Sequence, residues 1–155
     1  MVLAALVLTV PLVSAQGRRP NAELMTSADS KVTAKGGSAR LTLRVALPAG
    51  LHVQANKPRD PDLIPTVLTV EAPKGAKIAQ VIYPKPVDFA QAGAKQPLAV
   101  YPNVFDIVVQ MTFAPGATPG PLTIPATLRY QACNESLCFP PARAEAKWAL
   151  TIPKG

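Results

Sequence analysis

The chain has two cysteines, Cys133 and Cys138, in the stretch YQACNESLCFPP. Such a pair either forms a disulfide that holds a domain together or exchanges electrons with another protein. The stretch predicts a strand that continues to Ala132, a four-residue turn, and a chain that returns after Cys138. Residues that face each other across a hairpin have Cα atoms about 4.5–5.5 Å apart, a separation that a disulfide accepts. The two cysteines can therefore bridge across the turn.

The surroundings of the pair bear on its reactivity. Pro140 and Pro141 cannot donate ladder hydrogen bonds, so we expect the returning strand to lie at a sheet edge, where a partner could reach the sulfurs. No predicted helix N-terminus lies nearby to lower a thiol pKa, and Glu135 in the turn disfavours a thiolate. The spacing by itself therefore favours a structural disulfide over a reactive dithiol.

Metal and hydrolytic chemistry fit the sequence less well. The two cysteines, His52 and Met111 could together bind a soft metal such as copper. No ligand pairs with zinc spacing surround them, and Met111 falls in phase with the apolar side of its predicted strand. His52 is the single histidine, and the chain has no G-x-S-x-G motif for a hydrolase. We predict no metal and no cofactor.

The N-terminus predicts export. Residues 2–13 form an apolar run that ends in small residues at Ser14 and Ala15, as a signal peptidase requires. The run is shorter than the stretch of about 20 residues that spans a bilayer; the alternative is a buried N-terminal strand or helix. We predict a signal peptide at 1–15 and a single domain at 16–155. A domain of that size can form a core without a disulfide.

The charge limits the class of partner. The chain carries 16 Lys and Arg against 9 Asp and Glu, a formal net charge of +7. These cations are scattered, and no basic stripe interleaved with aromatic residues is present, so we predict no binding to nucleic acid. A basic surface of this kind suits acidic partners or an anionic membrane surface.

Alternating apolar residues predict the fold. Eighteen prolines and nine glycines leave few uninterrupted windows for a helix. Strands are expected at 39–47, 66–72, 76–83, 104–113, 121–132 and 144–152. Their core faces are expected to be Leu41, Leu43, Val45, Leu47, Phe105, Ile107, Val109, Met111, Phe113, Ile124, Ala126, Leu128, Tyr130, Ala146, Trp148, Leu150 and Ile152. The pattern predicts an all-β chain folded as an antiparallel β-sandwich.

Two stretches depart from the strand pattern. Residues 49–66 begin with a short strand and continue as a loop rich in Pro and Asp. Residues 83–103 read as a connection of about 20 residues, a length that is uncommon without a function. Tyr83 and Tyr101 lie near its two ends and favour a segment that packs down as a lid.

Three stretches together resemble one family. These are YQACNESLCFPP, GLHVQANKP at residues 50–58, and the YPKP…VYPN connection. Between about residues 27 and 152 the chain resembles the N-terminal periplasmic domain of the thiol:disulfide interchange protein DsbD. The resemblance implies an immunoglobulin-like fold, which agrees with the predicted sandwich, and a periplasmic location.

The resemblance also implies a function. A domain of this family receives electrons from a thioredoxin-like donor, such as part of a DsbD-type membrane protein, and reduces oxidised periplasmic thiol proteins. Cys138 would form the mixed disulfides with partners and Cys133 would resolve them, which makes the chain a protein-disulfide reductase component. There are two alternatives: the donor is a separate protein, or this domain is a fragment of a longer protein that also contains the donor.

The family has a loop that caps its cysteine pair. By resemblance, residues 83–103 would form this cap, with Phe89 as the capping side chain and Asp88 as a neighbour that handles protons. Tyr130 and Phe139, which lie in the same stretch before and after the two cysteines, would be further neighbours of the site. The alternative function is a non-catalytic secreted β-sandwich binding module with a structural disulfide, which predicts a reduction potential below about −300 mV.

Overall fold

The computed structural model describes residues 20–154, so the predicted signal peptide lies outside the described residues. Within them the chain forms strands only, which confirms the all-β prediction. They are β1 (Glu23–Ser30), β2 (Gly37–Ala46), β3 (His52–Gln54), β4 (Val67–Val70), β5 (Ala76–Ile82), β6 (Val87–Phe89), β7 (Leu98–Tyr101), β8 (Val104–Phe113), β9 (Gly120–Tyr130), β10 (Ala132–Cys133) and β11 (Ala142–Ile152). No stretch of this described part forms a helix long and apolar enough to cross a membrane.

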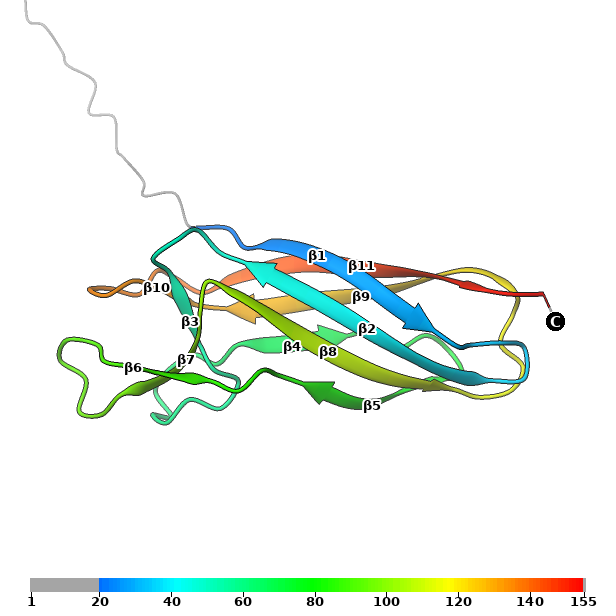
Figure 1. Cartoon of the computed structure of the whole chain (residues 1–155), viewed down its shortest axis with the longest axis horizontal. Coiled ribbons are helices and arrows are strands. Elements are labelled where there is room, and N and C mark those ends of the chain that lie inside the picture. The colour runs from blue at the N-terminus through cyan, green and yellow to red at the C-terminus, as the bar shows by residue number, and fades with distance from the viewer. Residues whose placement is uncertain (1–19, 155) are drawn as a thin grey trace, which may run out of the picture.

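Two antiparallel sheets pack face to face and form the body of the domain (Figure 1). The first sheet has the order β1-β2-β8-β5, and the second has the order β11-β9-β4. Their neighbouring strands are antiparallel throughout. The architecture is the predicted immunoglobulin-like β-sandwich.

The core of the body lies between these sheets, where the sequence alternation places it. The expected apolar faces of β2, β8 and β9 are all buried, and Trp148, Leu150 and Ile152 complete the core from β11. The indole Nε1 of Trp148 donates a hydrogen bond to the carbonyl oxygen of Thr42 at 3.0 Å. Since Thr42 belongs to the first sheet and Trp148 to the second, this bond ties the two sheets together.

A third sheet of short strands lies at one end of the sandwich (Figure 1). Its order is β10-β3-β7-β6, and we call it the end sheet. The expected connection at residues 83–103 is therefore corrected, because it contains β6 and β7. All four side chains of β7 are buried, so this strand has no apolar–polar alternation by which to recognise it.

The chain changes sheets just before the cysteine pair. The expected strand at 121–132 is two strands: β9 pairs with β4 and β11, whereas β10 pairs with β3 in the end sheet. Alternation does not reveal this change because it gives the face of a residue and not its sheet. The Nε2 of Gln131, at the junction, donates a hydrogen bond to the Phe139 carbonyl oxygen at 3.0 Å.

The tyrosines that bound residues 83–103 are packed down, as expected. Their rings stack with centroids 6.2 Å apart. The Tyr83 hydroxyl accepts a hydrogen bond from the Leu68 backbone N–H at 2.8 Å, and the Tyr101 hydroxyl donates to Asn56 Oδ1 at 2.5 Å. Burial raises the pKa of both tyrosines. The β6–β7 segment is thus anchored at its two ends.

Candidate functional site

Cys133 and Cys138 form a disulfide across a tight hairpin. The Asn134 N–H donates to the Leu137 carbonyl oxygen at 2.9 Å, and the Phe139 N–H donates to the Ala132 carbonyl oxygen at 2.8 Å. The cysteines lie between these two hydrogen-bonded rungs, a position at which antiparallel Cα atoms approach most closely. Their Cα atoms are 4.0 Å apart, slightly closer than we expected.

The side chain of Asn134 shapes the turn between the cysteines. Its Oδ1 accepts hydrogen bonds from the Ser136 N–H at 2.9 Å and the Leu137 N–H at 2.8 Å. Asn favours such turns because its short side chain can replace a backbone acceptor. Glu135 and Leu137 are exposed. The turn is fixed locally and leaves the second cysteine at the surface.

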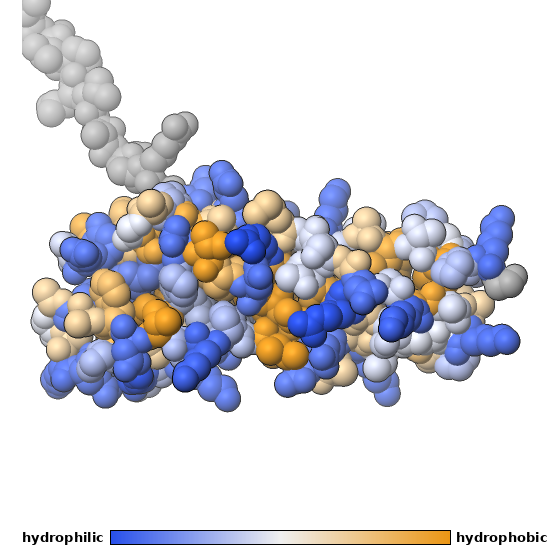
Figure 2. Space-filling view, viewed as in Figure 1, coloured by the Kyte–Doolittle hydropathy of each residue, from blue (hydrophilic) through white to orange (hydrophobic). Residues whose placement is uncertain are grey.

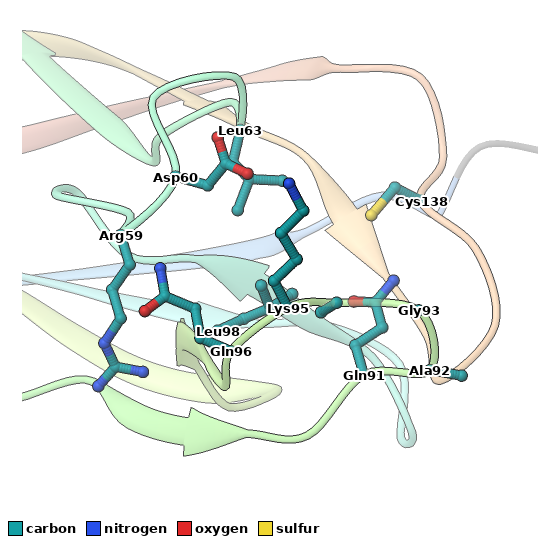
Figure 3. Close-up of a pocket in the computed structure, with 11 residues that line it drawn as sticks. Arg59, Asp60, Leu63, Gln91, Ala92, Gly93, Lys95, Gln96, Leu98 and Cys138 are labelled. Carbon is teal, nitrogen blue, oxygen red and sulfur yellow. The ribbon is translucent and has the colours of Figure 1, made fainter.

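The two sulfurs have unequal environments. Cys133 is fully buried, at 0% exposure, whereas Cys138 is exposed. Cys138 lines a pocket of about 470 Å³, and Figure 3 shows its sulfur pointing toward the other lining residues. The pocket is bounded by residues 59–63 from the loop after β3 and by residues 91–98 from the β6–β7 segment.

Arg59 joins the two walls of this pocket. Its Nη2 forms an ion pair with Asp88 Oδ1 at 2.5 Å, and its Nη1 donates to the Pro97 carbonyl oxygen at 2.5 Å. Asp88 is the residue predicted to handle protons, and its side chain is 68% exposed. The structure therefore gives its carboxylate a partner in the neighbouring loop.

Phe89, the predicted cap, contacts His52, which lies beside the disulfide. The two rings pack with centroids 4.1 Å apart, and His52 is the register partner of Cys133 across β3 and β10. His52 is only 5% exposed, and burial lowers the pKa of its imidazole below the ordinary 6.5. Phe89 thus covers the residue next to the disulfide.

His52 was grouped with the cysteine pair only as a candidate ligand of a soft metal, and its position beside Cys133 was not predicted from the sequence. His52 lies in the GLHVQANKP stretch, and β3 alternation puts His52 and Gln54 on one face, but the partner strand was not identifiable from sequence. Arg59, Gln91 and Lys95, which line the pocket beside Cys138, were also missed. Their loops carry no pattern that reveals which side chains converge.

Tyr130 and Phe139, the other two predicted neighbours, lie before and after the cysteine pair in the chain and pack in or against the sandwich core. The Tyr130 hydroxyl accepts a hydrogen bond from the Ala22 N–H at 2.8 Å and donates to the Pro20 carbonyl oxygen at 3.4 Å. Phe139 is half-buried and packs against the sandwich core. The hydroxyl of Tyr130 therefore binds the start of the described chain.

The four donors considered for a soft metal are not gathered at one place. The cysteine pair and His52 are neighbours in the end sheet, whereas Met111 is a core residue of β8 in the first sheet. Within residues 20–154, no group of three or more His, Cys, Asp or Glu residues is arranged to hold a metal ion.

The fold and the site together define an immunoglobulin-like sandwich with a disulfide at one end, one cysteine buried and the other open to a pocket. The chain belongs to the family of the N-terminal domain of the thiol:disulfide interchange protein DsbD, whose family model matches residues 21–149. It is accordingly a thiol–disulfide interchange domain, and its partners are thiol–disulfide redox proteins in general. A search of curated proteins finds no match to the chain.

Solved structures that are similar to this chain include two N-terminal domains. The N-terminal domain of DsbD from Neisseria meningitidis, in the reduced form, is 17% identical, with 83% of this chain and 85% of that chain covered and a TM-score of 0.46. The N-terminal periplasmic domain of ScsB from Proteus mirabilis is 15% identical, with 84% of this chain and 46% of that chain covered and a TM-score of 0.51. At this identity the likeness to the ScsB domain concerns the fold alone.

Proposed function

We propose that this domain works in the periplasm, accepts electrons from a thioredoxin-like donor, and reduces oxidised periplasmic thiol proteins through Cys133 and Cys138. The observation that carries the proposal is the unequal exposure of the two cysteines. A partner sulfur must approach the sulfur that it attacks or that attacks it. Only Cys138 is open to such an approach.

The proposed reaction has two steps. In the reduced domain the Cys138 thiolate attacks the partner disulfide, which forms a mixed disulfide and releases one partner thiolate. The Cys133 thiolate then attacks the Cys138 sulfur, which re-forms the Cys133–Cys138 disulfide and releases the second partner thiolate. The partner gains two electrons, and a thioredoxin-like dithiol restores them by the reverse sequence.

The proposed location rests on the family and on the predicted signal peptide at residues 1–15. The similar ScsB domain is described as periplasmic. Disulfides form and persist in oxidising compartments, and the cysteine pair of this chain is a disulfide. The periplasm would supply both oxidised partners and a protein donor.

The proposal is tested by trapping. Cys133→Ser and Cys138→Ser variants are each incubated with an oxidised thioredoxin-fold protein, and adducts are separated on non-reducing gels. Cys133→Ser, which keeps the exposed thiol, is expected to accumulate a covalent adduct, because the thiol that would resolve it is absent. Cys138→Ser is the matched control and is expected to form none, since its remaining thiol is buried.

A second measurement distinguishes an interchange domain from a domain whose disulfide is purely structural. The wild-type domain is equilibrated with glutathione buffers of increasing reducing strength, and free thiols are blocked by alkylation. An interchange pair becomes reduced within the buffer range and more rapidly when a thioredoxin-like donor is added. A pair that stays oxidised throughout and resists the donor contradicts the proposal and favours the binding module, whose disulfide would be structural.

A further inference from the structure

The end sheet has a buried face outside the sandwich core. Val53 and Tyr101 are register partners on the inner face and belong to the core. Because side chains alternate along a strand, His52 and Gln54 lie on the outer face. Cys133 shares that face as the register partner of His52. Cys133, His52 and Gln54 are all buried, and Cys133 lies outside the hydrophobic core cluster of the sandwich.

This outer face contains polar atoms without partners. Within the described chain, His52 Nε2 and both side-chain amide atoms of Gln54 are buried and make no hydrogen bond. Buried polar atoms are nearly always paired, so an unpaired one calls for an explanation. The ring of Phe89 packs against the imidazole, but it offers Nε2 no hydrogen-bond acceptor.

The proposed reaction requires a proton acceptor at this place. Cys133 must become a thiolate before it can attack the mixed disulfide. Burial disfavours a thiolate, and Cys133 is fully buried. Direct register partners have Cβ atoms about 4.5–5.5 Å apart, so an imidazole nitrogen of His52 can reach the Cys133 sulfur once the disulfide is open.

We propose that His52 accepts the proton of the Cys133 thiol during resolution of the mixed disulfide. The proposal rests on the proposed interchange function. The S–H bond of Cys133 breaks and its proton moves to the imidazole, while the thiolate attacks the Cys138 sulfur. A Cys133–Cys138 bond forms, the partner leaves as a thiolate, and the imidazolium loses its proton to solvent.

The charged and titratable groups around His52 leave the imidazole free for this task. On β7, Tyr101 points to the inner face, and its hydroxyl is bound to Asn56. On β6, Asp88 alternates with Phe89 and is paired with Arg59. On β10 the titratable group is Cys133 itself, and Glu135 in the following turn is exposed. Burial lowers the pKa of His52, so the imidazole is neutral at neutral pH and can accept a proton.

A small aromatic disulfide, 5,5′-dithiobis(2-nitrobenzoate), separates the two chemical steps. Attack by Cys138 of the pre-reduced domain releases one coloured thiolate, and resolution by Cys133 releases a second. Stopped-flow absorbance therefore records two phases in the wild type. Cys133→Ser should retain only the first phase, which assigns the second phase to resolution.

The central variant is His52→Gln, which keeps a polar side chain but cannot take up a proton near neutral pH. We expect its second phase at pH 7 to slow about tenfold or more relative to its first phase, as for loss of a general base. Gln54→Met is the matched control: it changes the next residue on the same face and should keep the wild-type ratio of the two phases.

The pH profile of the wild type gives a test that does not depend on a variant. If His52 is the acceptor, the second-phase rate rises to a plateau just above the imidazole pKa, which NMR of the single histidine measures directly in the reduced domain. Without an internal acceptor the rate climbs about tenfold per pH unit until the ordinary thiol pKa near 8.5.

The outcomes separate the two proposals. Two phases with an unchanged ratio in His52→Gln, or a wild-type rate that climbs to the thiol pKa, overturn the role of His52 and leave the interchange function standing. Absence of both phases in the wild type contradicts the interchange function itself. Should His52→Gln fail to fold, the wild-type pH profile decides by the same criterion.

Discussion

The body of the sandwich and the end sheet differ in the length of their strands and in the burial of their side chains. Strands β2, β8, β9 and β11 of the body have 10 or 11 residues and bury alternate side chains. Strands β3, β6, β7 and β10 of the end sheet have 2 to 4 residues, and three of them are buried along their whole length. Figure 2 shows hydrophobic residues gathered in patches among hydrophilic ones on the face in view.

The difference assigns most of the stability to the body and the chemistry to the end sheet, whose inner-face residues Val53 and Tyr101 also pack in the core. Long paired strands and an apolar core supply the folding free energy of the body. The end sheet holds the disulfide, the pocket and the unpaired polar atoms of His52 and Gln54. Unpaired buried polar atoms destabilise the folded state, so a site can contain them only where the neighbouring structure is stable enough to offset this loss. The cysteine hairpin begins one residue after β9, so the body positions it directly.

Trp148→Ala should give the largest effect and should act on the body. The variant removes a fully buried indole and its bond to Thr42, and such truncations cost about 3–5 kcal/mol. Urea unfolding followed by circular dichroism measures this loss. Leu137→Ala, at a 50% exposed turn position, is the control and should change the free energy of unfolding by less than about 0.5 kcal/mol.

The thiol–disulfide reaction of Trp148→Ala tests whether the body and the end sheet act independently. The fraction that remains folded should show the same two phases of thiolate release as the wild type, because the end sheet supplies those groups. A Trp148→Ala protein that unfolds at the wild-type urea midpoint would show that the body does not carry the stability. A folded variant with an altered ratio of phases would show that body and end sheet are not separable.

The body was predictable from sequence because its strands are long and have one buried face. Leu41, Leu43 and Val45 recur with period two, as do the apolar residues of β8, and this signal fixes both the strand and its buried face. β1 was missed because nearly all its side chains are exposed. An edge strand of this kind lacks the apolar stripe.

The end sheet was not predictable in the same way. β7 is buried on both faces, and β6 and β10 are too short for any period to emerge. Cys133 and Cys138 were found from their type and spacing, and Phe89 and Asp88 only through the family resemblance. The pairing of His52 with Cys133 depends on residues about 80 positions apart, and no local pattern encodes it.

Near neutral pH, the change of the free energy of unfolding with pH should reflect the titration of His52 in the end sheet. The folded-state pKa of His52 lies below the unfolded value of 6.5, so the unfolded chain binds its proton first as the pH falls. The stabilising effect of a neutral His52 is therefore complete above pH 6.5 and is lost as the pH falls from there toward the folded-state pKa.

Urea unfolding at a series of pH values between 8 and 5 measures this effect. The wild type should lose stability below pH 6.5, and His52→Gln should give a flatter profile over the same interval. The expected loss is smaller than that of Trp148→Ala. Parallel profiles for the two proteins would mean that His52 titrates alike in the folded and unfolded chains, which contradicts its burial as the cause of the shift.

Asp88→Asn should have the smallest effect on the free energy of unfolding, but it should make Cys138 more accessible to reagents. Exposed ion pairs contribute about 0–1 kcal/mol, so the urea midpoint should hardly move. The Asp88–Arg59 pair, however, joins two segments that wall the pocket beside Cys138. Its loss should speed hydrogen exchange in residues 87–98 and alkylation of Cys138 in a Cys133→Ser background.

The body provides a matched control for that ion pair. Arg44 and Asp106 form an exposed pair at 3.6 Å between β2 and β8, where the strand ladder already fixes both residues. Asp106→Asn should leave alkylation of Cys138 unchanged. High salt should make the wild type resemble Asp88→Asn, since screening weakens exposed pairs. Equal alkylation rates in the two variants would mean that the walls of the pocket do not depend on Arg59, and that the end sheet holds its site by backbone pairing, as the body does.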